Sequence, residues 1–441
     1  MCADHARGRR VAAGATLALA LATGGLVAAQ VPEPASGPCA IRESGRFPIK
    51  PDSSTELYVE PRLLVAGSGG RTLLAGTHNH LFRRAAAGQW VRAGGEEIFG
   101  AVIDANAAVG IVPSPIPTSA VVVPRAVARG DDAWSVVFLE AAREGQESDS
   151  RDVRGLWHAE LRGVEWSGLE RVPVPAGRVE VYSPSSLLLH DGSLTWAVVV
   201  RTAAGLYPVV VLQRGESGWS YHTVPTHFAG ELDVARGRDG RLLLAVVQPD
   251  LTLPRDGNSL FLWRLGETWT SLGKLVASQR EAAKDPALVI GAQRDVLSWG
   301  AVPAGAERLE LHAMADPEQV PRPPILTVDA QISGDSPIAP VRVGREFLFV
   351  TDHVLEGDER EIRFSRLAQS DVQLVSAVRH GFIANFAATA TDDSTVVVVG
   401  GRGETAQNVL ALYPNYYLVP SYSAIYSEML RFRTTCAPNR R

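Results

Sequence analysis

The sequence predicts an all-β fold, a β-propeller of seven four-stranded blades closed near the two ends of the chain. Three observations lead to this prediction: a unit of about 50 residues recurs seven times, its apolar runs are short and separated by Gly and Asp turns, and helix signals are few. Six blades is the alternative, because the first copy of the unit could be an inserted hairpin. Since each blade packs on its neighbours, a chain of this length can form one domain.

The repeat unit is clearest in residues 58–76, YVEPRLLVAGSGGRTLLAG, where a proline precedes an apolar run, a glycine cluster and a second apolar run. This pattern predicts the hairpin of the two inner strands of the first blade, with the glycines in the turn. Because the first strand of each blade lines the central axis, we expect the long apolar runs there. The same frame recurs at seven anchors: Pro61, Pro124, Pro184, Leu232, Pro286, Pro337 and Phe386.

Residues 1–29 have the features of a secretory signal, since Arg9 and Arg10 precede an apolar run that ends in small residues. We therefore expect a secreted or periplasmic bacterial protein, exported by the general or the twin-arginine route. No later stretch is long and apolar enough to span a membrane. The expected organisation is a signal at 1–29, an N-terminal segment at 30–54 and a single propeller at 55–441.

Two cysteines remain once the signal is removed, Cys39 and Cys436, one near each end of the chain. In an oxidising compartment such a pair is expected to form a disulfide bond. A bond across so many residues requires that the fold brings its ends together, which a closed propeller does.

The charge of the chain argues against polyanionic partners. The formal net charge is −5, which gives no electrostatic basis for binding nucleic acid or an anionic membrane. No cofactor is expected, because phosphate-binding glycine loops, Cys/His clusters and serine-nucleophile motifs are absent from the sequence. His78 and His80 could share one face of a strand, but they lack a third ligand, so no metal is predicted. The expected partner of a monomer is an extracellular glycan or protein.

The residues Tyr58 and Pro61, with RTLLAG at 71–76, resemble the first blade of the sialidase-like (neuraminidase, BNR-repeat-like) propellers. That family opens with an aromatic residue, Arg, Ile and Pro, followed by an apolar strand. The resemblance implies the propeller fold, but most of the family's catalytic motif residues are absent. Val59 occupies the position of the arginine that binds the substrate carboxylate, and the stretch 421–429 implies Tyr422 as a weak candidate for the catalytic tyrosine.

Two functions remain open on the sequence alone. The first is a binding protein that takes a glycan or a protein at the mouth of the central channel; the alternative is an exo-acting glycoside hydrolase that uses carboxylates and a tyrosine at the same face. The absence of the motif arginine favours binding without catalysis. Polar residues at the connections between blades and at the turns between second and third strands are the ligand-binding candidates: Glu60, Arg62, Arg201, Asp285, Asp335, Asp352, His353, Arg402 and Glu404.

Overall fold

The computed structural model describes residues 39–53, 55–84, 90–92, 98–130, 132–141, 153–174, 178–179, 186–250, 257–275, 282–302, 308–332, 340–355, 359–367, 371–382, 386–412 and 418–435. In these ranges the regular structure consists of thirty β-strands and one short 3-10 helix, η1 (Ser68–Gly70). The all-β prediction is confirmed. Nothing helical in the same ranges approaches the length and apolarity that crossing a membrane requires.

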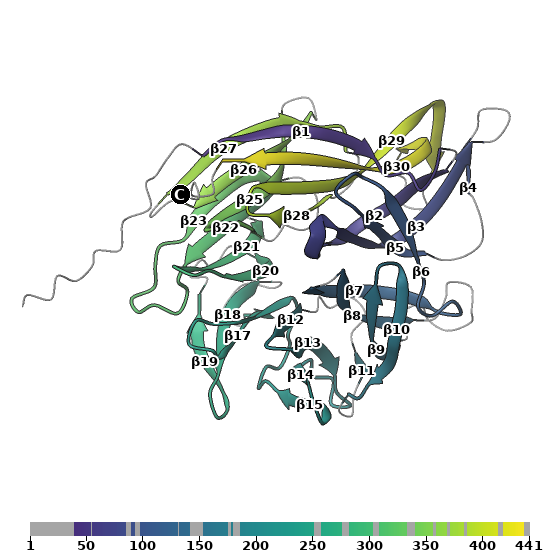
Figure 1. Cartoon of the computed structure of the whole chain (residues 1–441). Helices are drawn as coiled ribbons and strands as arrows, with labels where there is room; N and C mark the ends of the chain where they lie inside the picture. The colour runs from purple at the N-terminus through teal and green to yellow at the C-terminus, as the bar shows by residue number, and fades with distance from the viewer. Residues whose placement is uncertain are drawn as a thin grey trace, which may run out of the picture. The chain divides into compact units, whose positions relative to one another are not determined.

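The repeating element is an antiparallel sheet whose strands pair in chain order (Figure 1). The first sheet contains β2 (Thr55–Ala66), β3 (Thr72–Arg84), β5 (Ile98–Ile103) and β6 (Val109–Pro113), with β4 (Trp90–Arg92) paired to β3. The second contains β7 (Ala120–Gly130), β8 (Ala133–Ala141), β9 (Val153–Arg162) and β10 (Glu165–Val172). The third contains β12 (Ser186–His190), β13 (Ser193–Arg201), β14 (Val209–Gly215) and β15 (Gly218–Thr223), with β11 (Arg178–Val179) paired to β13.

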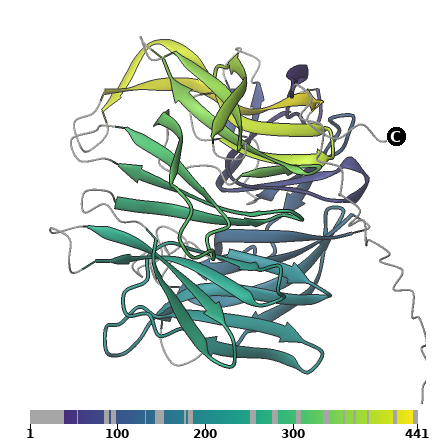
Figure 2. The same ribbon diagram turned by 90° about the vertical axis from the view of Figure 1, so that its left-hand side faces the viewer.

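The rest of the described chain continues this pattern, which Figure 2 shows from the side. The fourth sheet contains β16 (Leu232–Arg236), β17 (Leu242–Pro249), β18 (Asn258–Leu265) and β19 (Trp269–Lys274). An eight-stranded sheet follows with β20 (Ala282–Ile290), β21 (Asp295–Val302), β22 (Leu309–Ala315), β23 (Leu326–Ile332), β24 (Val341–Val343), β25 (Glu346–Val354), β26 (Arg360–Leu367) and β27 (Val372–Arg379). Its two halves are joined by a single residue pair, Ile332 with His353.

The last sheet contains strands from both ends of the described chain. It consists of β28 (Phe386–Asp392), β29 (Thr395–Leu412), β30 (Leu418–Thr434) and β1 (Ile41–Pro48). β1 runs antiparallel to β30, with Ile41 opposite Thr434 (Figure 1). The segment 30–54 therefore supplies a strand to the C-terminal sheet.

The first hairpin is formed as the sequence predicts, with β2 and β3 on either side of the glycine cluster. Gly69 and Gly70 adopt φ angles of 68° and 76°, a backbone conformation that glycine adopts without steric cost. The prediction that the long apolar runs are first strands is wrong, however. They are the second strands, such as β13 and β17, and their apolar residues do not alternate with polar ones because both faces of these strands are buried.

Packing between sheets explains why both faces are apolar. On β13, Ala197 and Val199 pack against the fourth sheet, whereas Trp196 and Val198 pack against the second sheet. The largest fully buried side chains include Trp134, Trp196 and Trp299, each on the second strand of its sheet. The core is therefore a series of apolar layers between successive sheets.

One of these apolar layers joins the last sheet to the first. Val399 and Met429 of the last sheet pack with Leu57 and Val59 of β2. Ser427 adds polar contacts, because its hydroxyl accepts a hydrogen bond from the Val59 backbone N–H (2.9 Å) and donates one to the Val59 carbonyl (3.2 Å). Val59, which stands where the related family has its arginine, is thus a buried packing residue.

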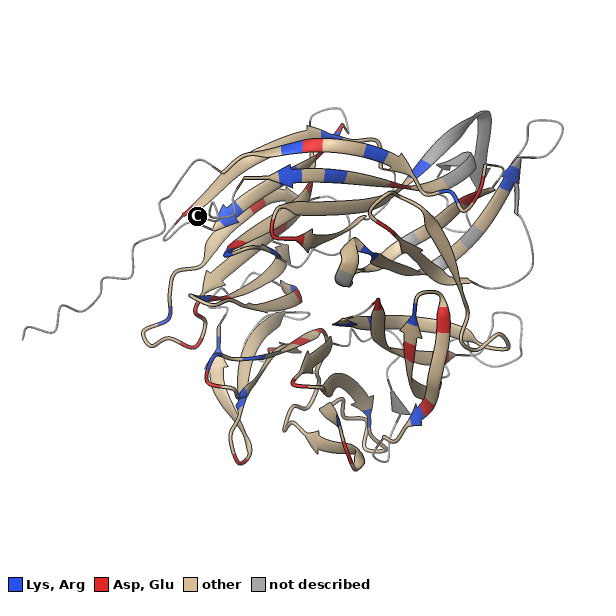
Figure 3. Cartoon of the chain, in the orientation of Figure 1, with Lys and Arg blue, Asp and Glu red and all other residues tan. Residues whose placement is uncertain are grey.

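Charged side chains of both signs are interspersed along the same strands, as Figure 3 shows. Many of them form ion pairs between strands or sheets. Arg129 contacts Glu160 at 2.6 Å within the second sheet, and Arg214 of the third sheet contacts Glu170 of the second at 2.7 Å. Arginine here therefore serves in part to connect adjacent strands and sheets.

We expect Cys39 and Cys436 to be bonded, although Cys436 lies outside the described residues. The adjacent residues are paired, since Thr435 N–H donates to the Ala40 carbonyl at 3.0 Å and the Ala40 N–H donates to Thr435 Oγ1 at 3.2 Å. In the chain-entropy description, a bond that closes about 400 residues stabilises by up to about 6 kcal/mol. Peptide mapping without reductant should find the linked peptides, and Cys39→Ser should lower the free energy of unfolding. Alkylation of both thiols in the native protein would contradict this.

Gly100 in β5 should not tolerate a side chain. A Cβ atom at this position would overlap the carbonyl oxygen of Leu74 on the neighbouring strand β3, so the two strands would have to separate. We expect Gly100→Ala to lower the free energy of unfolding by about 1–3 kcal/mol, measured by urea denaturation. Gly215→Ala is the matched control, since a Cβ there meets no atom within 4 Å, and its effect should stay within about 0.5 kcal/mol. Equal effects of the two variants would contradict the packing argument.

Candidate functional site

The candidate site is a cavity of about 430 Å³. It is formed by the third sheet, the fourth sheet and the first strands of the eight-stranded sheet. It is lined by Tyr207, Phe228, Ala229, Gly230, Glu231, Val247, Pro249, Asn258, Ala283, Lys284 and Val302. Its position follows from the strand ends: Glu231 directly precedes β16, while Pro249 and Val302 end the second strands β17 and β21. The cavity thus lies at the edge where connections between sheets meet the turns between second and third strands. The sequence analysis predicted ligand binding at this edge.

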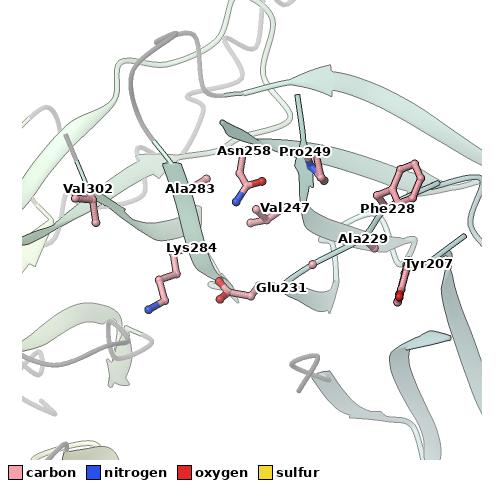
Figure 4. Close-up of a pocket in the computed structure, with 11 residues that line it drawn as sticks. Tyr207, Phe228, Ala229, Glu231, Val247, Pro249, Asn258, Ala283, Lys284 and Val302 are labelled. Atoms are coloured by element: carbon pink, nitrogen blue, oxygen red, sulfur yellow. The ribbon is translucent and has the colours of Figure 1, made fainter. Parts of the chain in front are cut away.

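Two aromatic rings form one side of the cavity. Tyr207 and Phe228 have ring centroids 6.4 Å apart, and Phe228 is 49% exposed (Figure 4). Backbone hydrogen bonds hold the two residues in register, since Tyr207 N–H donates to the His227 carbonyl at 2.7 Å and Ala229 N–H donates to the Tyr207 carbonyl at 2.8 Å. An exposed aromatic face supported in this way is an apolar surface on which a ligand ring can pack.

The carboxyl group of Glu231 lies between the aromatic residues and Lys284 (Figure 4). Its backbone is paired with β17, because Val247 N–H donates to the Glu231 carbonyl at 2.8 Å. Its side chain accepts a hydrogen bond from the backbone N–H of Asp285 in β20. Asp285 has a φ of 44° and lies where the register of β20 shifts, so a local irregularity of that strand directs this N–H toward Glu231.

The environment of Glu231 favours its neutral form. Burial is the main cause, and the negative charge of Asp285 adds to it, so that the pKa of Glu231 is raised from 4.5 to about 7. The Asp285 N–H and the positive charge of Lys284 act in the opposite direction. Near neutral pH this side chain can therefore donate or accept a proton, which is the property of a general acid or of a proton-linked binding group.

Asp233 lies two residues beyond Glu231 and connects three inner strands. Its carboxylate accepts hydrogen bonds from the Ser186 hydroxyl of β12, from the Val234 N–H at 3.0 Å and from the Leu288 N–H of β20 at 2.6 Å. Burial raises its pKa to about 6 in spite of these bonds. Asp233 thereby positions β12, β16 and β20 relative to one another beneath the cavity.

The cavity brings together only part of the set that the sequence predicted. Asp285 contributes its backbone N–H, and Arg201 lies with its guanidinium carbon 5.8 Å from the centroid of the Tyr207 ring. Arg402 is elsewhere and forms an ion pair with Glu428 at 3.1 Å.

Asp352 and His353 are buried inside β25, and this strand does not end before them as the apolar run suggested. Asp352 contacts His380 at 2.9 Å, whereas His353 contacts Asp329 at 2.8 Å. These two side chains therefore join the polar contacts between strands.

The other candidates cannot be placed. Asp335 lies outside the described residues, and so do the side chains of Glu60, Arg62, Glu404, Tyr422, His78 and His80. Their proposed roles stay predictions. No group of three or more His, Cys, Asp or Glu side chains that could hold a metal ion occurs in the part of the chain that the structure describes.

Five lining residues were not predicted from the sequence: Glu231, Lys284, Tyr207, Phe228 and Asn258. For Glu231 a signal was present, because it directly precedes the anchor Leu232 just as Asp285 precedes the anchor Pro286. For the aromatic residues no signal was present, since Tyr207 and Phe228 belong to connections that become neighbours only through backbone pairing.

Comparisons with known proteins support the fold. No protein-family model matches the chain, and no curated protein matches its sequence. Among solved structures, the polysaccharide lyase Uly1 is similar with a TM-score of 0.51 and 9% identity, over 89% of this chain and 99% of that one. At this identity the similarity concerns the fold alone, which is propeller-like.

Two further structures are similar at lower scores. A PL25 ulvan lyase has a TM-score of 0.46 and 9% identity, over 81% of this chain and 93% of that one. The subtype N11 neuraminidase-like protein of A/flat-faced bat/Peru/033/2010 has a TM-score of 0.40 and 12% identity, over 70% of this chain and 87% of that one.

Glu231 should make stability depend on pH. Because its pKa is raised in the folded state, the folded state binds the proton more strongly than the unfolded state does. The resulting stabilisation is complete below pH 4.5 and is lost as the pH rises through about 7. We expect the stability of the native protein relative to Glu231→Gln to fall by about 2–3 kcal/mol between pH 4.5 and 8, as measured by urea unfolding. Glu216→Gln, in the exposed turn between β14 and β15, is the control and should leave the pH dependence unchanged. A pH profile that is the same for Glu231→Gln and the native protein would refute this assignment.

Proposed function

We propose that this protein binds carbohydrate in the cavity that contains Glu231. The observation that carries the proposal is the exposed Phe228 ring, next to Tyr207, in one cavity with a carboxyl, an amide and an ammonium group. Sugar rings present apolar C–H faces that pack on aromatic rings, and hydroxyl groups that need hydrogen-bond partners. A cavity of about 430 Å³ with a mostly apolar lining and few polar groups is in the range of small-ligand sites.

The lining favours binding over hydrolysis. Glycoside hydrolysis usually needs two carboxyl groups on opposite sides of the scissile bond. Of the described residues that line the cavity, Glu231 alone carries a carboxylate. The position of the family's carboxylate-binding arginine is the packed Val59, which is a further argument against sialidase activity.

Hydrolysis is the second candidate, and a specific observation favours it. The pKa of Glu231 is close to neutral, as a general acid requires, and the charge of Asp285 contributes to the shift. In this alternative Glu231 protonates the leaving group, and the candidate for the second carboxylate is Asp285, which does not itself line the cavity. Tyr422 stays a prediction for the tyrosine of a sialidase-like reaction.

For the fold we propose a closed ring of seven blades. The four-stranded repeats, the two halves of the eight-stranded sheet and the apolar layer between the last and first sheets support this arrangement. The pairing of β1 with β30 supports closure next to Cys39 and Cys436. Export by the N-terminal signal and a monomeric state complete the proposal. A polysaccharide lyase has a similar fold, so a glycan ligand is compatible with this architecture.

Removing the aromatic surface should weaken glycan binding. We expect Phe228→Ala and Tyr207→Ala each to reduce affinity by roughly 3- to 10-fold, since an aromatic contact contributes about 0.5–1.5 kcal/mol beyond buried area. Calorimetry with the best binder from a panel of neutral and acidic oligosaccharides provides the measurement.

Tyr221→Ala is the matched control, because Tyr221 is 51% exposed on β15 and does not line the cavity. If no oligosaccharide of the panel binds, the proposal is wrong. Turnover of a fluorogenic glycoside that is lost in Glu231→Gln would decide for the hydrolase instead.

A further inference from the structure

Lys284 differs from the other lysines of the chain in its contacts with the described acidic residues. The sequence contains three lysines. Lys50 contacts Glu56 at 2.7 Å and Lys274 contacts Asp250 at 2.8 Å. Lys284 forms no salt bridge with any described carboxylate, although it lines the same cavity as Glu231 (Figure 4).

The Glu231 carboxyl group, which lines the same cavity as Lys284, already has a hydrogen-bond donor. This carboxyl group accepts the Asp285 N–H and is half-buried beside the Asp285 charge, so that its neutral and ionised forms have similar populations near pH 7. A neutral carboxyl attracts the ammonium of Lys284 only weakly. The cavity therefore contains a cation with no described acidic partner next to a carboxyl group that can donate a hydrogen bond, and this pair is complementary to an anion.

We propose that the cavity takes an anionic group of the ligand between Lys284 and Glu231, and that Glu231 takes up a proton when this anion binds. The inference rests on the function proposed above, because the same aromatic rings hold the remainder of the ligand. Lys284 supplies the positive charge. Protonated Glu231 donates its O–H to the anion, and the proton comes from solvent, so that no charge is left without a partner.

The groups around Glu231 determine the direction of the pH effect. β20 contributes Lys284 and Asp285, the connection between β13 and β14 contributes the Tyr207 phenol, and β18 contributes the neutral Asn258. His227 and Asp233 are the nearest titratable residues on either side of Glu231 in the sequence. A bound anion adds negative charge beside Glu231 and raises its pKa further. Affinity should therefore be highest below pH 7 and fall above it, approaching a tenfold fall per pH unit once Glu231 is mostly ionised in the free protein.

The three lysines allow a direct measurement. Acetylation of each lysine is followed by mass spectrometry in the native protein, with sodium sulfate, galacturonate or galactose as the added probe and sodium chloride to match ionic strength. Sulfate and galacturonate should protect Lys284, while Lys50 and Lys274 serve as internal references. The concentration for half-protection should rise roughly fivefold from pH 7 to pH 8. In Glu231→Gln this rise should disappear.

The possible outcomes distinguish failure of the anion site from failure of carbohydrate binding. If galactose protects Lys284 as well as galacturonate does, the ligand is neutral and the inference is wrong while sugar binding stands. If sulfate protects Lys284 but no saccharide binds, the anion site stands and the carbohydrate proposal falls. Protection that is independent of pH in the native protein would overturn the proton uptake. Lys274→Ala, which removes the same charge outside the cavity, should leave the protection of Lys284 unchanged.

Discussion

The structure depends on the burial of both faces of the second strand in each sheet. Strands such as β13 and β17 are apolar along almost their whole length, so a single sheet would expose one of its apolar faces to water. Burial of a Val or Leu side chain contributes about 1.5–3 kcal/mol, and each second strand carries several. A strand of this kind needs another sheet against each of its faces, and the apolar layer between β2 and the last sheet is one such contact.

This stacking also creates the candidate site. When sheets pack face to face, the connections between them cross the edge of the stack, and polar groups of three sheets meet there. Glu231 is one such group: its backbone is paired with β17, its side chain accepts a hydrogen bond from β20, and its connection pairs with Tyr207. The same crowding that positions Glu231 removes water from it, and this raises its pKa. The packing of three sheets thus determines both the position of Glu231 and its raised pKa.

Many of the polar side chains form hydrogen bonds or ion pairs between strands. Asp352 and His353 are buried and have imidazole and carboxylate partners within 2.9 Å, because a buried polar group must be paired. Arg402 is more exposed, and it pairs with Glu428 of the neighbouring strand at 3.1 Å. His158 is a further example, with contacts to Ser135 and Glu170 at 2.9 Å each and 1% exposure. These groups resemble catalytic arrangements in composition, but their burial indicates a role in joining strands.

The sequence by itself determined the all-β class, the β2–β3 hairpin and the recurring unit, because strand patterns and glycine turns are local properties of the chain. It also predicted the edge at which the cavity lies, and it singled out Asp285, whose N–H contacts Glu231. Only the tertiary structure decided that the apolar runs are second strands, since burial on two faces depends on neighbouring sheets. It alone decided which polar residues line a cavity: Glu231, Lys284 and Phe228 are far apart along the chain, and they meet because backbone pairing and apolar stacking bring three sheets together.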